Sequence, residues 1–172
     1  MRVAYRARQA MQRLFAARRH GETEAAEQLL SPPALALYRQ MSPGDRWHGQ
    51  QVLDALRAAG DWDAAVQQAA LLHDVGKAHA GLTLVHRTLV VLMQAGAPGL
   101  LQRLAGDGTP AWRRPFHVQV HHAGIGAEMC ARAGCSSVTV ALVRAHQGAE
   151  RAALPPELRA AAVALEQADD RS

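Results

Sequence analysis

Cysteine and aromatic residues are scarce in this chain of 172 residues, and each scarcity excludes a class of protein. Two cysteines cannot build a disulfide framework, and the spacing of Cys130 and Cys135 does not match a zinc knuckle. Aromatic residues make up 4% of the chain, and no basic patch interleaved with aromatic residues is present, as would be typical of nucleic-acid binding. We therefore do not expect a nucleic-acid polymer as partner.

Long apolar runs are also missing. The most apolar stretch, residues 82–93, is interrupted by His86 and Arg87, so no transmembrane segment is expected. We expect no membrane partner and a cytoplasmic protein, and we leave open a homodimer in which this stretch forms the interface. The arginine-rich residues 1–19 have the composition of an organelle transit peptide, but an amphipathic basic helix of a cytosolic protein is the preferred interpretation.

Alanine and leucine are abundant, and this composition favours helices over strands. With 49% hydrophobic residues the chain is long and apolar enough to bury one core. We expect a single all-α domain over residues 1–172, with an N-terminal helical extension at 1–41 and a core at 44–170. Its net charge of +4 suits an anionic ligand, and a small molecule that carries phosphate is preferred to nucleic acid.

Proline and glycine divide the chain into helical segments. Apolar residues recur at helical spacing between these breakers, and no alternating strand pattern stands out. The pattern predicts roughly eight or nine helices in a bundle, among them residues 2–19, 32–40, 44–59, 83–95, 115–133 and 136–146. Gly76 and Gly134 stand where helices are expected to end, and residues 106–115 are expected to form a loop.

Nine histidines is a high number, and their placement indicates a metal site. Five separate predicted helices each present a side chain that can bind a metal, which suits an ion held between facing helices. Adjacent helical residues differ by about 100° in direction, so a histidine and its neighbouring aspartate can converge only near a helix end. The side chains concerned are His48, His73 with Asp74, His122, His146 and Asp169.

The other histidines are weaker candidates for metal ligands. His117 and His121 are four residues apart, so they share a helix face and could form a metal pair of their own, although no third ligand is evident. His86 could face the site from its helix. Isolated histidines such as His20 and His79 are expected on the surface or in hydrogen-bonded core positions.

Three segments together resemble the HD-domain superfamily of metal-dependent phosphohydrolases, an all-α family. They are His48, the run LLHDVGK at 71–77, and Asp169 in LEQADD. Two further segments resemble members with two-metal sites: HHAGIGAEM matches the pattern H-x-x-x-G-A-E through His122, and VALVRAHQ ends in His146. The Gly-Tyr-Pro sequence of the cyclic di-GMP branch is absent, so hydrolysis of cyclic di-GMP is not expected.

The resemblance implies a ligand set. His48, His73, Asp74 and Asp169 would surround one metal, and His122 with His146 would complete a second, with Asp74 bridging the two. Asp169 is preferred to Asp170, and His122 to His121, although both alternatives stay open. The implied cofactor is one or two divalent ions of Mn, Fe, Co, Ni, Mg or Zn.

The expected activity is cleavage of a phosphomonoester or phosphodiester, with a nucleotide or dinucleotide as substrate. Asp74 and Lys77 are the candidate catalytic residues. Lys77, Arg113 and Arg114 are the candidate phosphate contacts, although Lys77 could instead be a solvated cation at a helix end. The alternative is a catalytically silent module of the same fold that binds nucleotides in regulation.

Overall fold

Nine α-helices form the architecture of the described residues. The computed structural model describes residues 24–78, 84–106, 110–148 and 150–172, and no strand occurs among them. The expected all-α helical bundle is thereby confirmed, whereas the helix expected over residues 2–19 lies outside the described residues. The helices are α2 (Glu24–Leu29), α3 (Pro32–Gln40), α4 (Pro43–Ala59), α5 (Ala64–Leu72), α6 (Leu84–Gly96), α7 (Pro98–Leu104), α8 (Arg114–Arg132), α9 (Ser137–Ala145) and α10 (Pro156–Arg171).

Local sequence explains most of the helix ends. Proline occupies the first turn of α3, α4, α7, α8 and α10, where its missing N–H removes no helical hydrogen bond. Ser42 and Ser136 cap α4 and α9 by accepting backbone hydrogen bonds at 3.2 and 3.1 Å. Gly134, with a φ of 75°, ends α8 as expected, and the Cys135 N–H then donates to the Cys130 carbonyl at 3.0 Å.

Three short 3₁₀ turns were not expected from the sequence. They are η1 (Val75–Lys77), η2 (Ala111–Arg113) and η3 (Arg151–Ala153). The loop expected over 106–115 therefore contains η2, and α8 begins at Arg114. The expectation that Gly76 terminates a helix is wrong, because α5 already ends at Leu72 and Gly76 lies inside η1.

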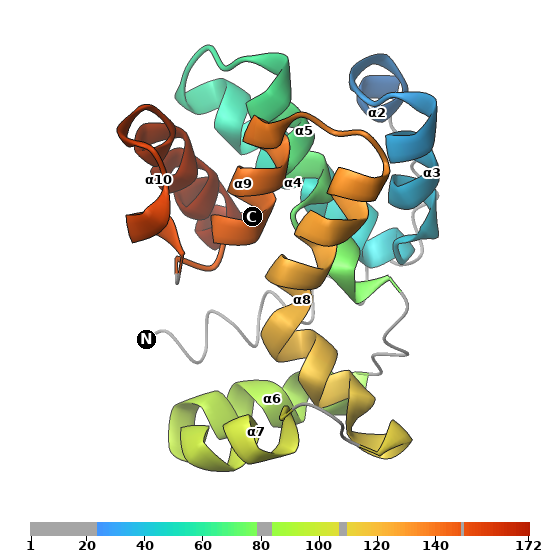
Figure 1. Cartoon of the computed structure of the whole chain (residues 1–172), viewed down its shortest axis with the longest axis vertical. Helices are drawn as coiled ribbons and strands as arrows, with labels where there is room; N and C mark the ends of the chain where they lie inside the picture. Colours follow the sequence, from blue (N-terminus) through green and yellow to red (C-terminus); the bar gives the residue numbers. More distant parts are fainter. Residues whose placement is uncertain (1–23, 79–83, 107–109, 149) are drawn as a thin grey trace.

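A main helical bundle contains most of the buried residues (Figure 1). Its core draws apolar side chains from α2, α3, α4, α5, α9, α10 and the second half of α8. Ala26, Leu30 and Tyr38 belong to this core, so α2 and α3 pack into it together with the later helices. Thr139 Oγ1 donates to the Ala65 carbonyl at 3.0 Å and ties α9 to α5.

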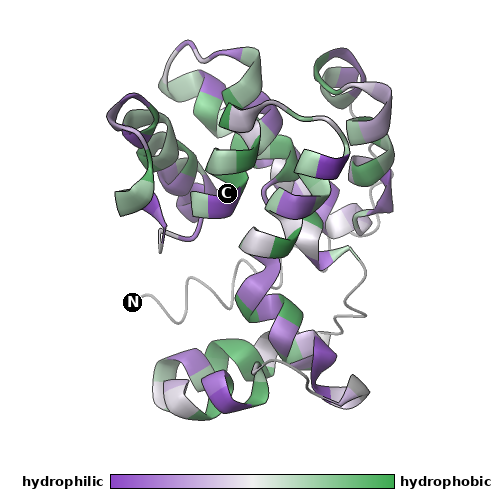
Figure 2. Ribbon diagram, viewed as in Figure 1, coloured by the Kyte–Doolittle hydropathy of each residue, from purple (hydrophilic) through white to green (hydrophobic). Residues whose placement is uncertain are grey.

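The second packing unit is small and lies at one end of α8 (Figure 1). Residues 84–106 and 110–114 form this unit, which we call the α6–α7 lobe, and α6 and α7 pack there against each other and against α8. Its core consists of Val90 and Leu101 together with Phe116, which α8 contributes. Figure 2 shows apolar residues on the helices of the lobe as well as within the main bundle. Among the described residues, no helix has the length and apolar character needed to span a bilayer.

Candidate metal centre

Side chains from five helices meet in two groups that can each hold a metal ion. His48, His73 and Asp169 form the first group, and Asp74, His122 and His146 form the second. Within each group the potential ligand atoms lie within 4.8 Å of one another. The structure therefore brings together all six side chains that the sequence analysis assigned to the metal site.

The first group joins α4, the end of α5 and α10. His48 Nε2 lies 2.7 Å from Asp169 Oδ1, and His73 Nε2 lies 3.7 Å from the same oxygen. Asp169, rather than the exposed Asp170, thus faces the histidines. Figure 1 shows α10 beside α4 and α9, which is how a residue near the C-terminus reaches His48.

The second group joins the end of α5, the middle of α8 and the end of α9. Asp74 Oδ1 lies 3.3 Å from His122 Nε2 and 4.0 Å from His146 Nε2, while the two histidine Nε2 atoms are 3.2 Å apart. The same Asp74 oxygen is 3.7 Å from His73 Nε2. Asp74 therefore lies between the two groups. His122 is buried there, whereas His121 is exposed.

Backbone carbonyls fix the tautomer of three of these histidines. His73, His122 and His146 each place Nδ1 at 2.6–2.8 Å from the carbonyl oxygen three residues earlier, on Ala70, Gln119 and Val143 respectively. A carbonyl can only accept, so Nδ1 carries the proton and Nε2 of a neutral ring keeps a free lone pair. For His73 and His146 the accepting carbonyl belongs to the last turn of a helix, where no helical N–H follows to use it.

The histidine Nε2 atoms that carry no proton and the Asp74 carboxylate would be stabilised by a positively charged partner. The Nε2 lone pairs of His122 and His146 face each other at 3.2 Å. His73 Nε2 and Asp74 Oδ2 are buried and have no hydrogen-bond partner among the described residues. Two atoms bound to one zinc-sized ion at about 2.0–2.1 Å lie roughly 2.9–3.4 Å apart. Two of the three spacings within the second group, 3.2 and 3.3 Å, lie in this range, and the third, 4.0 Å between Asp74 Oδ1 and His146 Nε2, is longer. Nitrogen with carboxylate oxygen is a donor set suited to transition metals.

Lys77 supplies the one positive charge that the described side chains place against Asp74. Its Nζ lies 2.6 Å from Asp74 Oδ1, and both side chains are buried. Burial alone would raise the pKa of Asp74, but the Lys77 ammonium together with His73 and His122 outweighs it, so the pKa of Asp74 stays well below its usual range. The alternative of a solvated helix-end cation is therefore wrong, because Lys77 is only 8% exposed.

Burial also keeps the histidines of the second group neutral. It lowers the pKa of His146 to about 3 and, with the nearby Lys77 charge, lowers the pKa of His122. The pKa of Asp169 is lowered as well, because burial, which raises it, is outweighed by the hydrogen bond with His48 together with the charges of His73 and His48. At neutral pH the second group consists of two neutral imidazoles and a carboxylate, which are the protonation states that metal ligation requires.

Glycines let the elements of the site approach closely. A Cβ on Gly76 would lie 2.1 Å from the His122 carbonyl oxygen, and a Cβ on Gly126 would lie 3.1 Å from the Gly76 nitrogen. A Cβ on Gly49 would lie 3.0 Å from the Leu71 carbonyl oxygen. Gly76 and Gly126 bring η1 against α8, and Gly49 brings α4 against α5. Each contact lies within a few residues of a metal-competent side chain.

Several candidate residues lie away from both groups. Arg114 is eight residues before His122 in α8, a rise of about 12 Å, and Arg113 precedes it in η2. Their role as phosphate contacts stays a prediction. The rings of His117 and His121 lie 4.6 Å apart, and His117 Nδ1 donates to the Ala105 carbonyl. His86 packs edge-on against Phe116 in the lobe and belongs to neither group.

Gln147 is a residue of the site that the sequence analysis did not single out. Its side-chain nitrogen lies 3.2 Å from His122 Nε2, although the residue is exposed. Its place directly after His146 was the available clue. A cavity of about 740 Å³ also runs along α8 beside α3 and reaches Gly76, but none of the six metal-competent side chains lines it.

Comparison of the chain with family models, with curated proteins and with solved structures finds no match in any of the three. The assignment of a function therefore depends on the geometry of the site and on the resemblance of its motifs.

Proposed function

We propose that the protein is an HD-type metal-dependent phosphohydrolase that acts on a nucleotide or dinucleotide. The observation that carries the proposal is the meeting of six buried or half-buried histidine and aspartate side chains from five helices, with Asp74 between the two groups. Uncompensated buried polar atoms are costly, and a site with this many bare nitrogens is difficult to explain as core packing. The all-helical architecture is compatible with the HD family.

The residues have distinct roles in this proposal. His48, His73 and Asp169 would hold one divalent ion, His122 and His146 would hold a second, and Asp74 would contribute to both. A divalent ion bound there would stabilise negative charge on phosphoryl oxygens and would lower the pKa of a bound water molecule. Lys77 keeps Asp74 ionised and oriented, since its ammonium contacts the Oδ1 atom directly. The Nδ1 hydrogen bonds hold three imidazoles with Nε2 toward the centre.

Replacing Asp74 tests the proposal. Purified without chelator, the protein is expected to contain a transition metal by elemental analysis and to hydrolyse members of a nucleotide panel with Mn²⁺ added. Asp74→Ala and Asp74→Asn should each lower turnover about a thousandfold or more, because both remove the shared carboxylate. Helical circular dichroism should remain in at least the isosteric Asn variant. Asp170→Ala, which removes an exposed neighbour of the site, is the matched control and should stay active.

Full activity in a folded Asp74 variant would refute the proposal. A protein that binds metal and nucleotide yet yields no product across the panel would instead indicate the regulatory, catalytically silent module. The second outcome is separated from the first by measuring nucleotide binding and product on the same metal-loaded sample.

A further inference from the structure

The α6–α7 lobe displays most of the exposed large apolar side chains of the described residues. Val85, Leu92 and Trp112 are 64%, 57% and 60% exposed, and Leu89 and Leu100 are exposed as well. Outside the lobe, the comparable described residue is Val163 in α10. Isolated exposed apolar residues are ordinary, but a group of them in one small unit indicates an interaction surface.

Helical geometry places three of these residues on one face. Val85, Leu89 and Leu92 are separated by four and three residues, so they form a stripe along α6. Val90, which is buried against the small core of the lobe, points to the opposite side of the helix. The stripe is therefore the outer face of the lobe, and no described element covers it.

The sequence segments of the lobe and of the main bundle have net charges of opposite sign. By sequence, residues 84–114 contain four arginines and one aspartate, a net charge of +3. Residues 24–83 and 115–172 contain nine basic and thirteen acidic side chains, a net charge of −4. The apolar outer face thus belongs to the positively charged end of the described structure.

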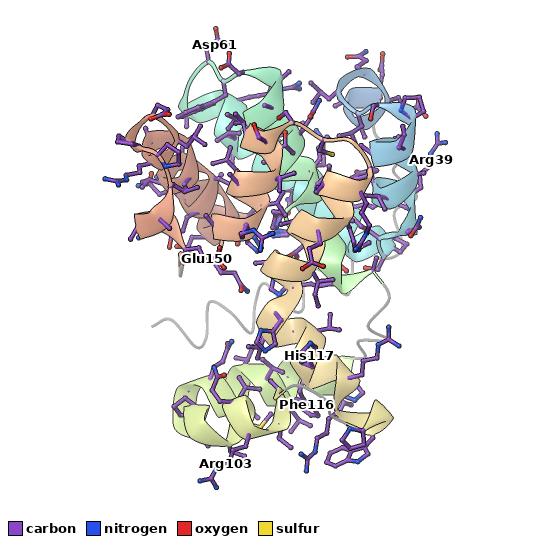
Figure 3. All side chains as sticks on the ribbon, in the orientation of Figure 1. Arg39, Asp61, Arg103, Phe116, His117 and Glu150 are labelled. Atoms are coloured by element: carbon purple, nitrogen blue, oxygen red, sulfur yellow. The ribbon has the colours of Figure 1, made fainter. Side chains whose placement is uncertain are left out.

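Tryptophan and arginine occur together on this lobe. The Arg113 guanidinium lies over the Trp112 ring, 4.7 Å from its centroid. Arg103 extends from α7 at the end of the molecule distant from the bundle (Figure 3). Exposed tryptophan with aliphatic and arginine side chains is the combination that stabilises proteins at the headgroup level of a bilayer.

We propose that the α6–α7 lobe docks on the surface of a lipid bilayer that contains anionic headgroups. The α6 stripe and Trp112 enter the interfacial region, and the arginines contact lipid phosphates. This proposal replaces the expectation of no membrane partner, which depended only on the absence of a spanning segment. A second copy of the chain fits this face less well, because two lobes of net positive charge would then meet. A nucleic-acid polymer would leave the apolar stripe exposed.

Vesicle sedimentation tests the proposal with the full chain. The protein is expected to sediment with vesicles of phosphatidylcholine and phosphatidylglycerol but not with phosphatidylcholine alone, and added salt should weaken the binding. The double variant Leu89→Ser/Leu92→Ser should bind more than tenfold more weakly, because it removes apolar area from the stripe. Arg103→Gln should bind roughly fivefold more weakly, since one basic residue at an anionic surface contributes about 1 kcal/mol.

Matched controls come from the main bundle. Val163→Ser and Arg39→Gln make the same kinds of change on α10 and α3, away from the lobe, and should bind like the unaltered protein. Unchanged binding by both folded lobe variants would overturn the proposal and point to another region, such as the arginine-rich residues 1–19. Equal sedimentation with both vesicle types would also overturn it. So would a dimer in solution that the serine substitutions dissociate, since that would assign the stripe to contact between copies.

Discussion

At the scale of single residues, the direction of each imidazole decides the chemistry. His73, His122 and His146 each donate a hydrogen bond from Nδ1 to a carbonyl three residues earlier, so their Nε2 atoms are the ones that converge. The arrangement is costly without a cation, because lone pairs face each other at 3.2 Å. Lys77 neutralises Asp74, and the Gln147 side-chain nitrogen lies 3.2 Å from His122 Nε2, but His73 Nε2 has no hydrogen-bond partner among the described residues. We therefore expect metal binding to depend on individual Nε2 atoms.

Adjacent residues of the chain allow a direct test of this expectation. His122→Ala should lower the amount of bound metal, measured by elemental analysis after gel filtration, by about half or more if the second group loses its ion. His121→Ala, one residue away but exposed, should leave metal content unchanged. Asp169→Ala and Asp170→Ala form a second pair with the same expectation. Equal metal content in both members of each pair would contradict the assignment.

Acidification should destabilise the metal-free protein. The pKa of His146 is about 3 in the folded state, whereas an unfolded histidine titrates near 6.5. The unfolded state therefore binds more protons between these values, and stability falls as the pH falls. The lowered pKa values of Asp74 and Asp169 act in the same direction at lower pH.

Between about pH 6.5 and about pH 4, the titration of His146 alone should lower the free energy of unfolding by roughly 3 kcal/mol. Denaturant unfolding with chelator present measures this dependence. His146→Gln, which cannot titrate, should show a smaller loss over the same range. An equal slope in the variant and the unaltered protein would show that His146 is not the group responsible.

At the scale of elements, close contact between η1 and α8 aligns Asp74 with His122. The contact is made through Gly76 and Gly126, and a side chain at Gly76 would overlap the His122 carbonyl. Overpacking of this kind usually costs about 1–3 kcal/mol. A change there should therefore disturb both stability and the metal site.

Two glycine substitutions distinguish the effect of this contact on stability from the general effect of helix propensity. Gly76→Ala should lower the free energy of unfolding by roughly 2 kcal/mol or more and should weaken metal binding. Gly124→Ala, in α8 but with open space around its Cβ, should raise the free energy of unfolding by about 0.5–1 kcal/mol. Chemical denaturation gives both values. A neutral Gly76→Ala would show that η1 and α8 can separate without cost.

The sequence predicts helices better than it predicts the contacts between them. Proline and glycine act locally, so the ends of α3, α4 and α8 follow closely from Pro32, Pro43 and Gly134. The turn η1 was missed because three residues carry no periodic pattern. The metal groups were predicted because rare residue types recur in a known arrangement. Gln147 was overlooked because its distance from His122 depends on tertiary packing.

At the scale of the whole molecule, metal binding and folding should be linked. The ligands come from α4, α5, α8, α9 and α10, so the unfolded chain does not hold them together. An ion at a hundredfold excess over its dissociation constant adds about 2.7 kcal/mol to stability. For a chain of this size the melting temperature should rise by roughly 5–10 °C.

Differential scanning fluorimetry with Mn²⁺, and then with excess chelator, measures this shift. The double variant His48→Ala/His122→Ala lacks one nitrogen in each group and should lose most of the shift. Chelator should return the unaltered protein to its metal-free melting temperature. A shift of unchanged size in the double variant would place the stabilising ion elsewhere.

The 19 residues of α8 form one uninterrupted helix of roughly 28 Å. Phe116 near its start packs in the lobe, and Ala127 and Cys130 near its end pack in the main bundle. His122 lies between these two anchored regions. The helix therefore connects the lobe to the metal centre without a break. A partner bound to the lobe would act on one end of the same helix that positions the His122 imidazole, so binding at that end and ligand geometry in the interior would be coupled through α8.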